Sequence, residues 1–470
     1  MDGTGPVVVF ANFLSDLAVD LTESGALAGW AEQAPRKAWL LRPGDVLVTP
    51  VPLSEAFLRY VGGLTRVPTD EVTVVQVPSA GTEAPPSGGA VPMGEALRAA
   101  GLTERLRALT DGSGGALLPT ALDASAVTLA RDLGITVRPF PTVDAAAAAL
   151  EVTRRLNTKA GFREVAAELG VRLPDGRVCR RGEVPETVRE LLETYERVVV
   201  KPDRSAGGHG LRFVSRGDPT WTEHALDPVG GPDGVWVVEE CVDVAESVSV
   251  QLEVSPTGTR PLYSGVMRTA RGAYTGYVSP LPPAFRRVCE ELERWGRALG
   301  GHLSRHGYAG PLGLDALVTT DGTLLAGESN VRRTATTTVQ AMVERLGTLS
   351  GLPPRAWSVG KGRAGSRFGF EEAVRRLAAH GLAFDPARGE GVVLYADAPP
   401  DGHSWRYAVI GADGDGVAGQ EVRLASALDF AVRSRPGLSQ PASGPASGSP
   451  TRSPSGSPSG SPSGRSDSSW

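Results

Sequence analysis

The sequence predicts a mixed fold, in which an α/β domain with a mostly parallel sheet comes first and α+β units follow. Short apolar runs alternate with polar or Ala-rich helical segments through roughly the first 150 residues, at 7–10, 46–48, 72–77 and 135–137. Such alternation is typical of a parallel sheet. Further along, Asp321-Gly322 stands between two alternating apolar runs. That pattern is a strong hairpin signal and indicates antiparallel structure.

The composition is that of a cytoplasmic protein. The 470 residues are enough for two or three domains, and 48 basic against 53 acidic residues give a net charge of −5. This balance argues against nucleic acid or a membrane surface as a main partner. The three cysteines are scattered without metal spacing, as expected in a reducing compartment. The first residues lack the basic character of a signal peptide, and no apolar run reaches membrane-spanning length.

Polar residues follow the first apolar strand directly and allow two interpretations. Asn12 and Ser15-Asp16 come just after residues 7–10, at the position where α/β folds bind ligands. Helix capping explains the same residues at least as well, because Asn, Ser and Asp are preferred N-caps.

A helix is predicted from Asn157-Thr158-Lys159 onward. Apolar residues recur there at helical spacing, Asn157 is a good N-cap and Gly170 is a good stop. Lys159 then lies in the first turn, where its charge opposes the helix dipole. An anionic ligand explains a lysine in this position, and the alternative is an ordinary exposed lysine.

A glycine-rich loop follows the short apolar strand at 197–200, which ends in Lys201. The loop contains Ser205, Gly207, Gly208 and Gly210. Glycines let the backbone approach phosphate oxygens closely, and Lys201 would add a positive charge. The spacing is not that of a P-loop, and the loop leads into a strand rather than a helix. The alternative is a flexible glycine hairpin.

The strand predicted at 235–238 runs into an acidic, partly apolar connector at 239–246. Backbone groups of such a connector can read an adenine edge, while a carboxylate binds the ribose hydroxyls. The alternative is that these acids are solvated loop residues.

Arg268 ends another predicted strand, from which it is positioned to reach a phosphate. A salt-bridged surface arginine is the alternative. The glycine-containing loop that follows carries Arg271, Tyr274 and Tyr277 and is positioned to cover an acceptor substrate.

The Asp321-Gly322 turn is the most informative feature of the chain. Counting outward from a two-residue turn places Asp315 directly opposite Glu328, with Asn330 two residues further on the same side. Like charges opposite one another destabilise a hairpin, and a divalent cation between them removes that penalty. Oxygen ligands of this kind suit Mg²⁺. The alternative is a surface hairpin whose acids point into water.

Arg332 and Arg333 follow this hairpin closely. Arginine offers a fixed fork of donors that suits phosphate oxygens. Two adjacent arginines beside a carboxylate pair therefore indicate phosphate oxygens nearby. The alternative is that they only neutralise the acids.

The last part of the chain predicts a small module and a tail. From about residue 353, an amphipathic helix at 370–380 and strands at 392–395 and 405–410 indicate an α+β unit. Residues 437–470 are nearly all Ser, Gly, Pro and Ala. Such a segment cannot bury enough apolar surface to offset its ordering entropy, so a disordered tail is predicted.

The order and spacing of these motifs resemble the ATP-grasp superfamily, typified by D-alanine–D-alanine ligase. The two acids of the hairpin have the same thirteen-residue gap as in that family. The resemblance implies ATP held between two α+β subdomains, together with two Mg²⁺ ions that Mn²⁺ can replace. It covers about residues 5 to 430, and its specific motifs lie between 157 and 338.

The resemblance also implies a role for each motif residue. Contacts to the nucleotide phosphates would come from Lys159 and Lys201, beneath a lid formed by Ser205, Gly207, Gly208 and Gly210. The adenine edge would be read by Glu239, Glu240 and Val242, and the ribose by Glu246. The magnesium ligands would be Asp315, Glu328 and Asn330.

One position departs from the family pattern. D-alanine–D-alanine ligases carry an arginine two residues before the first metal aspartate, whereas this chain has Gly313. Stabilisation of an acyl phosphate would then come from Arg332 or Arg333, and Arg268 is positioned for the γ-phosphate or the acyl phosphate.

Two stretches point to a narrower resemblance. Asn330-Val331-Arg332 resembles the Asn-x-Arg of amino-acid ligases in the superfamily. Residues 328–334 and 12–16 resemble the pattern of the actinobacterial pheganomycin-type peptide ligases.

By this resemblance the chain divides into four parts. They are a pre-ATP-grasp domain (1–150), an ATP-grasp domain (151–352), a small C-terminal α+β domain (353–434) and the disordered tail (435–470). The expected activity is that of an ADP-forming carboxylate–amine ligase, which makes an amide or peptide bond through an acyl phosphate in natural-product or antibiotic biosynthesis.

Two alternatives stand beside this expectation. One is a ligase that loads an amino acid onto the thiol of an acyl carrier protein. The other is a nucleotide-binding scaffold or phosphotransferase that forms no amide. The implied partners are amino-acid or peptide substrates, and a homodimer is compatible with these features.

Overall fold

A computed structural model describes residues 5–13, 15, 17, 29, 31–78, 91–110, 114–205, 207–218, 221, 234–270, 272–353 and 355–430. The predicted tail at 435–470 lies outside the described residues, and so do Asp16 and Arg271. None of the described helices combines the length and the hydropathy that a membrane span requires. All three cysteines carry free thiols.

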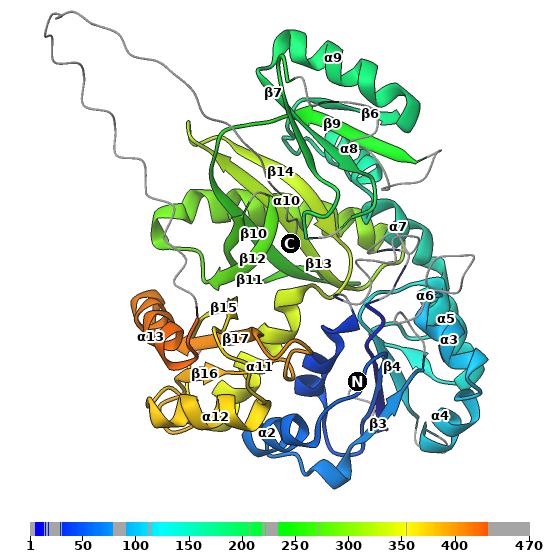
Figure 1. The fold of residues 1–470 in the computed structure, drawn as a ribbon. Helices are drawn as coiled ribbons and strands as arrows, with labels where there is room; N and C mark the ends of the chain where they lie inside the picture. Colours follow the sequence, from blue (N-terminus) through cyan, green and yellow to red (C-terminus); the bar gives the residue numbers. More distant parts are fainter. Residues whose placement is uncertain are drawn as a thin grey trace, which may run out of the picture. The chain divides into compact units, whose positions relative to one another are not determined.

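Five parallel strands form a sheet near the N-terminus, in the order β3-β2-β1-β4-β5. Two of them, β3 and β4, are labelled in Figure 1. β1 (Val7–Phe10) is central, and all four of its residues are buried, as expected of a parallel strand covered on both faces. The others are β2 (Val46–Thr49), β3 (Thr73–Gln76), β4 (Ala116–Pro119) and β5 (Thr136–Val137). The predicted parallel sheet is confirmed. Only β4 lacks a predicted counterpart, because its Ala-Leu-Leu-Pro run is short and contains a proline.

Helices connect these strands, and residues in the sequence mark where some of these helices begin and end. α5 (Ala124–Leu133) begins after Asp123, whose side chain accepts from the Ala126 amide, and ends at the left-handed Gly134. The other elements of this region are η1 (Ala34–Leu40), α2 (Glu55–Thr65), η2 (Thr69–Glu71), α3 (Met93–Ala99), α4 (Thr103–Thr110), α6 (Val143–Ala148) and α7 (Leu150–Leu156).

Asn12 joins the ends of β1 and β4. Its side-chain amide donates to the Ala121 carbonyl and the Asp123 carboxylate, and its oxygen accepts from the amides of Thr120 and Ala121. Each of these contacts is internal, so Asn12 acts as a structural residue at this edge of the sheet.

A second sheet has four antiparallel strands in the order β6-β9-β7-β8. They are β6 (Gly176–Arg180), β7 (Arg197–Pro202), β8 (Arg212–Ser215) and β9 (Val235–Glu240). α9 (Val184–Thr194), preceded by η3 (Arg181–Glu183), buries Val188 and Leu191 against Trp236 of β9. Pairing of Val199 with Glu239 puts Lys201, two residues along β7, on the same face as Glu239.

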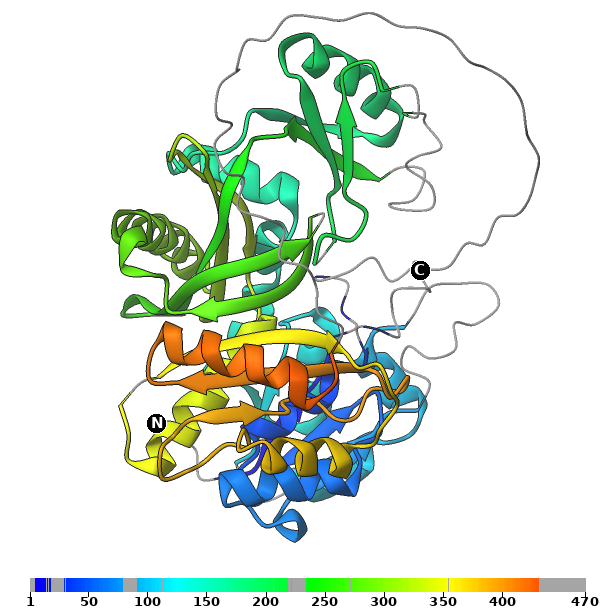
Figure 2. The same cartoon turned by 60° about the vertical axis from the view of Figure 1, so that its left-hand side comes forward.

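A third sheet has eight strands in the order β14-β13-β10-β11-β12-β15-β17-β16. They are β10 (Val244–Ser255), β11 (Gly258–Ala270), β12 (Ala273–Ser279), β13 (Gly310–Thr319), β14 (Leu324–Asn330), β15 (Ala356–Arg363), β16 (Gly391–Val393) and β17 (Ser404–Gly411). The strands predicted at 392–395 and 405–410 are therefore present. They continue the same sheet as the hairpin rather than forming one of their own, because β15 pairs with β12 (Figure 2).

Helices cover the two faces of this sheet. On one face, α10 (Arg286–Arg305), preceded by η5 (Pro283–Phe285), brings Gly296 against Leu252. On the other face, α11 (Ala335–Ser350) bonds to the sheet through Tyr263 and Thr336. The remaining helices are α8 (Lys159–Glu168), α12 (Phe370–Ala379) and α13 (Gly414–Ala427).

The ladder fixes which side chains share the α11 face. Successive cross-strand pairs join Asp315 to Ser249, Met267 to Tyr277 and Tyr277 to Val359. Ser249 also pairs with Gly265, two residues before Met267 on β11, and the ladder is regular between them. Asp315 and Val359 therefore lie on one face, and so does Lys361, two residues beyond Val359.

Candidate active site

The hairpin brings Asp315 opposite Glu328, as predicted, but by a different route. Thr319 and Thr323 close a loop of three residues instead of two, and Gly322 adopts a left-handed φ of 84°. This shifts the register by one residue as far as Ala316, which pairs with Ala326. A bulge between Ala316 and Asp315 then restores the expected pairing. The predicted two-residue turn is wrong, and two deviations of opposite sign leave the predicted pair intact.

Asp315 and Glu328 repel each other in an enclosed position. Burial and then the Glu328 charge raise the pKa of Asp315 to about 7, whereas hydrogen bonds from Ser249 and Asn330 and the charge of Arg332 act to lower it. The Asn330 amide nitrogen donates to the Asp315 carboxylate at 3.0 Å, which leaves its own oxygen as a further acceptor.

The donor set fits a hard cation. Two carboxylates and an amide oxygen converge at one end of the hairpin, and oxygen-only ligands suit Mg²⁺. Within the described residues, no group of three or more His, Cys, Asp or Glu side chains forms a metal-binding cluster. The predicted magnesium ligands therefore stay a prediction.

Gly313 has a steric reason in this chain. A Cβ atom at this position would lie 2.8 Å from the side-chain amide of Gln251. Gln251 donates to Ser249 and accepts from the Thr334 hydroxyl. Gln251 thus fills the space that a side chain at position 313 would need, and it links the β13–β14 hairpin to the N-terminus of α11.

The two adjacent arginines lie in different surroundings. Arg332 interacts with the charges of Glu328 and Asp315 and donates to Asn157. Arg333 interacts instead with Glu253 and Tyr308. Of the two candidates, Arg332 is therefore the one beside the acid pair, and the structure does not bring Arg333 to it.

Lys159 connects the acid pair to the glycine loop. It is the first residue of α8, as predicted, although the N-cap is Thr158 rather than Asn157. Its ammonium lies 3.6 Å from the Glu328 carboxylate and donates to the Ser205 hydroxyl at 3.0 Å. Burial lowers its pKa, while the Glu328 charge acts to raise it.

Asn157 has a different role from the predicted cap. Its side chain donates to the carbonyls of Thr153 and Val331 and accepts from the Val331 amide. It therefore fixes the segment that follows β14, including Arg332.

The glycine loop has the backbone that its composition predicts. Gly207, Gly208 and Gly210 have φ values of 64°, 83° and 75°, which residues other than glycine rarely adopt. A Cβ at Gly208 would also lie 2.1 Å from the Gly272 carbonyl oxygen, in the turn between β11 and β12. As predicted, the loop leads into a strand, β8.

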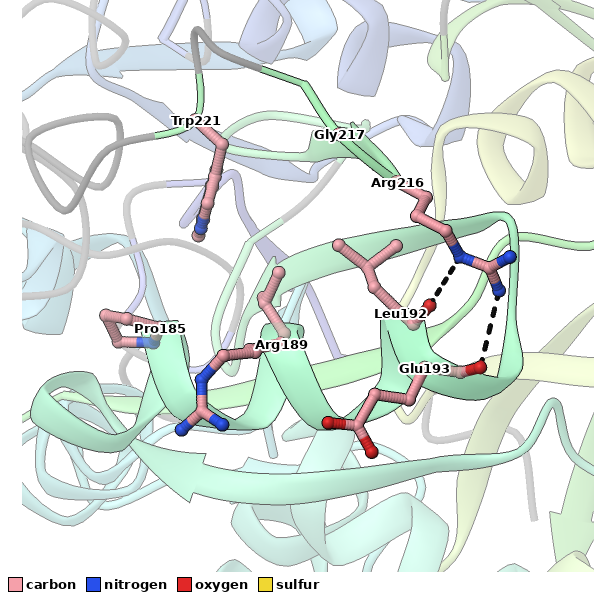
Figure 3. Close-up of a pocket in the computed structure, with 8 residues that line it drawn as sticks. Pro185, Arg189, Leu192, Glu193, Arg216, Gly217 and Trp221 are labelled. Atoms are coloured by element: carbon pink, nitrogen blue, oxygen red, sulfur yellow. Dashed lines mark hydrogen bonds between the residues drawn. The ribbon is translucent and has the colours of Figure 1, made fainter.

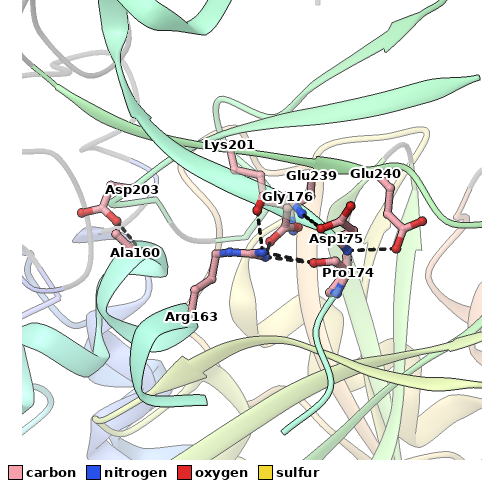
Figure 4. A network of polar contacts seen from close by, with 9 residues as sticks. All are labelled: Ala160, Arg163, Pro174, Asp175, Gly176, Lys201, Asp203, Glu239 and Glu240. Carbon is pink, nitrogen blue, oxygen red and sulfur yellow. Dashed lines mark hydrogen bonds and ion pairs between the residues drawn. The ribbon is translucent and has the colours of Figure 1, made fainter. Parts of the chain in front are cut away.

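Lys201 and Glu239 form part of a buried ion network (Figure 4). The Lys201 ammonium pairs with one carboxylate oxygen of Glu239, and Arg163 of α8 donates to the other at 2.6 Å. Glu239 is only 3% exposed. Its predicted role at an adenine edge stays a prediction, but its side chain is already engaged by two cations.

Two supporting residues had no predicted role. Arg163 also donates to the Pro174 and Gly176 carbonyls and so joins α8 to the small sheet. Asp203 accepts from the Ala160 amide at the start of α8. Neither residue belongs to a motif, and only the three-dimensional contacts reveal them.

The other connector residues lie at the exit from β9. Glu240 ends β9 and accepts from the Asp175 amide, as Figure 4 shows. Val242 is half-buried between β9 and β10. Glu246 lies on β10, and burial raises its pKa. Their predicted contacts to a nucleotide stay predictions.

Arg268 is not near the acid pair. It follows Met267 on β11 and therefore points to the opposite face of the sheet. There both of its terminal nitrogens donate to Glu421 of α13, at 2.7 and 2.8 Å. The salt-bridge alternative is correct for this conformation, and the predicted reach toward a phosphate is wrong.

A surface groove lies apart from these residues (Figure 3). It is lined by Pro185, Val188, Arg189, Leu192, Glu193, Arg216, Gly217 and Trp221. None of the predicted site residues lines it, so it is not part of the candidate active site.

Family models match two parts of the chain. Residues 34–135 match the model described as Pre ATP-grasp domain, and residues 372–424 match the PGM1 C-terminal domain. A comparison with curated proteins gives no match.

Solved structures match almost the whole chain. N5-carboxyaminoimidazole ribonucleotide synthetase from Thermus thermophilus gives a TM-score of 0.53 at 15% identity, over 91% of this chain and 100% of that one. The Aspergillus clavatus N5-carboxyaminoimidazole synthase, in complex with ADP and 5-aminoimidazole ribonucleotide, gives 0.54 at 12% identity, over 91% and 100%. Rhizobium etli pyruvate carboxylase gives 0.54 at 16% identity, over 90% of this chain and 37% of that one.

The fold is the ATP-grasp fold. At these identities the matches concern the fold, which agrees with the predicted α/β and α+β architecture. In this ATP-grasp fold, the residues singled out in the sequence at Lys159, Ser205, Asp315 and Glu328 are brought together.

Proposed function

We propose that the protein is an ATP-dependent carboxylate–amine ligase that forms an amide or peptide bond and releases ADP. The observation that carries this proposal is the continuity between the acid pair and the glycine loop. Lys159 lies 3.6 Å from Glu328 and donates to Ser205, so one cation contacts both the metal hairpin and the loop. Such an arrangement suits a triphosphate whose charge is shared between lysines and a divalent cation.

In this proposal the side chains position the triphosphate and balance its charge. Lys159 and Lys201 contact the phosphates, and the left-handed glycines of the loop direct backbone N–H groups at them. Asp315, Glu328 and Asn330 hold Mg²⁺, which neutralises phosphate charge when bound. Arg332 lies beside the acid pair and is positioned to stabilise the acyl phosphate.

The reaction requires no nucleophilic side chain. The γ-phosphoryl group leaves ADP and bonds to a substrate carboxylate oxygen, and an amine then attacks the carbonyl carbon and expels phosphate. Rate enhancement comes from positioning and from electrostatic stabilisation by the groups named above. We propose amino acids or peptides as substrates and a peptide-like natural product as the product, on the strength of the Asn330-Val331-Arg332 resemblance.

Hydroxylamine trapping tests the proposal. Each member of a panel of amino acids and short peptides is incubated with the protein, MgATP and hydroxylamine, and mass spectrometry follows ADP and hydroxamate. A ligase gives hydroxamate and phosphate with its true acid, and neither product forms when the acid is omitted.

The other results identify the alternatives. ADP release without hydroxamate indicates a phosphotransferase, whereas a covalent adduct on a phosphopantetheine carrier protein indicates carrier loading. No ADP release with any acid, together with measurable ATP binding, would count against the ligase.

A further inference from the structure

A second like-charged pair lies on the α11 face of the eight-stranded sheet. Lys361 of β15 stands directly opposite Arg406 of β17. Cations in this position repel each other, and among the described residues neither side chain makes an ion pair or a hydrogen bond. Arg363, two residues along β15, differs because Asp401 neutralises it at 2.9 Å.

Two further cations come from η1, and one of them, Arg36, interacts with both members of this pair. Arg36 and Lys37 are 3% and 1% exposed. They lie 4.7 and 5.2 Å from the centre of the Phe13 ring, and Lys37 also donates to the Thr338 hydroxyl at 3.0 Å. These contacts are with neutral groups, so the buried positive charge is not neutralised by a carboxylate among the described residues.

Unpartnered polar atoms mark the same place. The Arg36 Nε and the Tyr274 hydroxyl are buried and make no hydrogen bond. Buried donors without an acceptor are rare in native proteins. Because lysine and arginine side chains only donate, donors outnumber acceptors in the cluster, and a negatively charged acceptor would compensate it best.

Solvent can reach the cluster along Lys361, because this residue as a whole is exposed even though its ammonium group is partly buried. Burial of its ammonium and then the charges of Arg406 and Arg36 lower its pKa to about 8, and Glu32 acts in the opposite direction. A free anion would reverse this effect by pairing with the protonated ammonium.

Tyr274 links the cluster to the acid pair. Its hydroxyl interacts electrostatically with both Arg36 and Asp315. Along the sheet, β13 and β15 are separated by four strand-to-strand steps, and Lys361 lies four residues along β15 from Trp357, the residue level with Asp315. The two ends are therefore about 23 Å apart at the usual spacings. One substrate could therefore contact both ends of this face.

We propose that Lys361, Arg406 and Arg36 bind a carboxylate or phosphate group at the end of a substrate remote from its reacting group. This inference rests on the ligase function proposed above, which places the reacting end near Asp315 and Glu328. A single amino acid is too short for a span of about 23 Å, whereas an extended peptide of about seven residues covers it. The substrate class is an anionic peptide or a similarly extended acid.

Thermal unfolding tests the binding step without any turnover. The full chain is saturated with MgADP and titrated with succinate, inorganic phosphate or neutral succinamide. We expect succinate or phosphate, but not succinamide, to raise the midpoint in the wild type and in Arg363→Gln, the matched control. The rise should fall by more than half in Lys361→Gln and in Arg406→Gln.

The two anions distinguish the chemistry of the bound group. A larger response to succinate assigns a carboxylate, and a larger response to phosphate assigns a phosphate. An equal response in all four proteins, or an equal response to succinamide, would overturn the proposal. Because each substitution removes a charge from a repelling pair, folding should be retained, and an unchanged response to MgADP checks this.

Kinetics place the anion on the substrate. With the peptide identified by hydroxylamine trapping, Lys361→Gln and Arg406→Gln should raise its KM about tenfold or more, with kcat and the KM for ATP little changed. Blocking the remote anionic group of the peptide should cause the same loss in the wild type and no further loss in the variants. An unchanged KM in both variants would contradict the proposal. If no hydroxamate forms, the ligase proposal alone fails, and the thermal titration still decides whether the cluster binds anions.

Discussion

The two like-charged cross-strand pairs of the large sheet differ in how their charge is compensated. Near Asp315 and Glu328 the chain supplies donors, because Asn330 bonds to one acid and Lys159 lies 3.6 Å from the other. Near Lys361 and Arg406 no described carboxylate comes within ion-pair distance. The acid pair is thus partly neutralised by its own fold, whereas the basic pair has no such partner among the described residues.

This difference explains how one face of the sheet can bind both the reacting end and the remote end of the proposed substrate. Acids with nearby cations can exchange protein partners for a metal ion and phosphates without a large change in net charge. Cations without acids bind an anion by charge alone, so their occupancy should respond strongly to ionic strength.

Replacing Glu328 by Gln should abolish turnover, with a loss of at least about 10²-fold. The substitution keeps the size of the side chain but removes one of the two facing negative charges, so Mg²⁺ loses a ligand charge. Hydroxamate formation at saturating MgATP measures the effect. Glu344→Gln is the matched control, because Glu344 is an exposed acid of α11 whose carboxylate accepts from the Gln340 side chain. Near-normal turnover in Glu328→Gln would remove the acid pair from the mechanism.

Replacing Lys201 by Met should lower both stability and ATP affinity. Glu239 would keep Arg163 but lose one of its two cations. Breaking a buried ion pair costs about 3 kcal/mol or more. Urea unfolding measures the stability, and titration calorimetry measures ATP binding.

A second substitution separates the two effects. Lys201→Met with Glu239→Gln should recover most of the stability, because the uncompensated carboxylate is gone. ATP affinity should stay at least about tenfold below that of the wild type. Recovery of ATP affinity in the double variant would show that Lys201 acts only by supporting Glu239.

At the basic end, the KM for the anionic substrate should depend on pH through Lys361. Its pKa is lowered to about 8 by burial, Arg406 and Arg36. The ammonium is charged below that pH and loses its charge above it, so KM should rise as pH increases through about 8. Of the facing groups, Arg36 has its pKa lowered to about 10, also by burial, and stays charged in this range.

Substitutions at the same position check this pH dependence. Lys361→Arg keeps its charge and should give a low KM that is flat up to pH 9. Lys361→Gln should give a high KM that is equally flat. An unaltered rise of KM near pH 8 in Lys361→Arg would assign the titration to another group.

Local sequence signals predicted the acid end of the face well. The Asp-Gly turn, the alternating strands and the thirteen-residue spacing all lie within 310–330, so few other elements can alter the outcome. Even there, the pairing survived because the third loop residue and the bulge between Ala316 and Asp315 offset each other. The signal for the helix at Lys159 was equally local, and the predicted N-cap was only one residue away from the observed one, Thr158.

The basic end could not be predicted, because its register is set by the whole sheet. Lys361 and Arg406 come from strands separated by 40 residues between Arg363 and Ser404. Arg36 joins them from η1, in the N-terminal domain. No local pattern relates these three positions. Their proximity follows from the packing of η1, β15 and β17, which only the three-dimensional structure provides.

Arg268 marks the limit of strand-based prediction and gives the smallest expected effect. The position of a residue at the end of a strand does not determine which face of the sheet its side chain occupies. A shift of one residue moves the side chain to the opposite face. Since Arg268 pairs with Glu421 behind the sheet, Arg268→Gln should change kcat by less than about threefold. It should lower stability by about 1 kcal/mol, the value for a partly exposed ion pair. A double-mutant cycle with Glu421→Gln, measured by urea unfolding, should give a coupling of that size. A loss of about 10²-fold in kcat, with an unchanged unfolding midpoint, would instead return Arg268 to the phosphate side of the sheet.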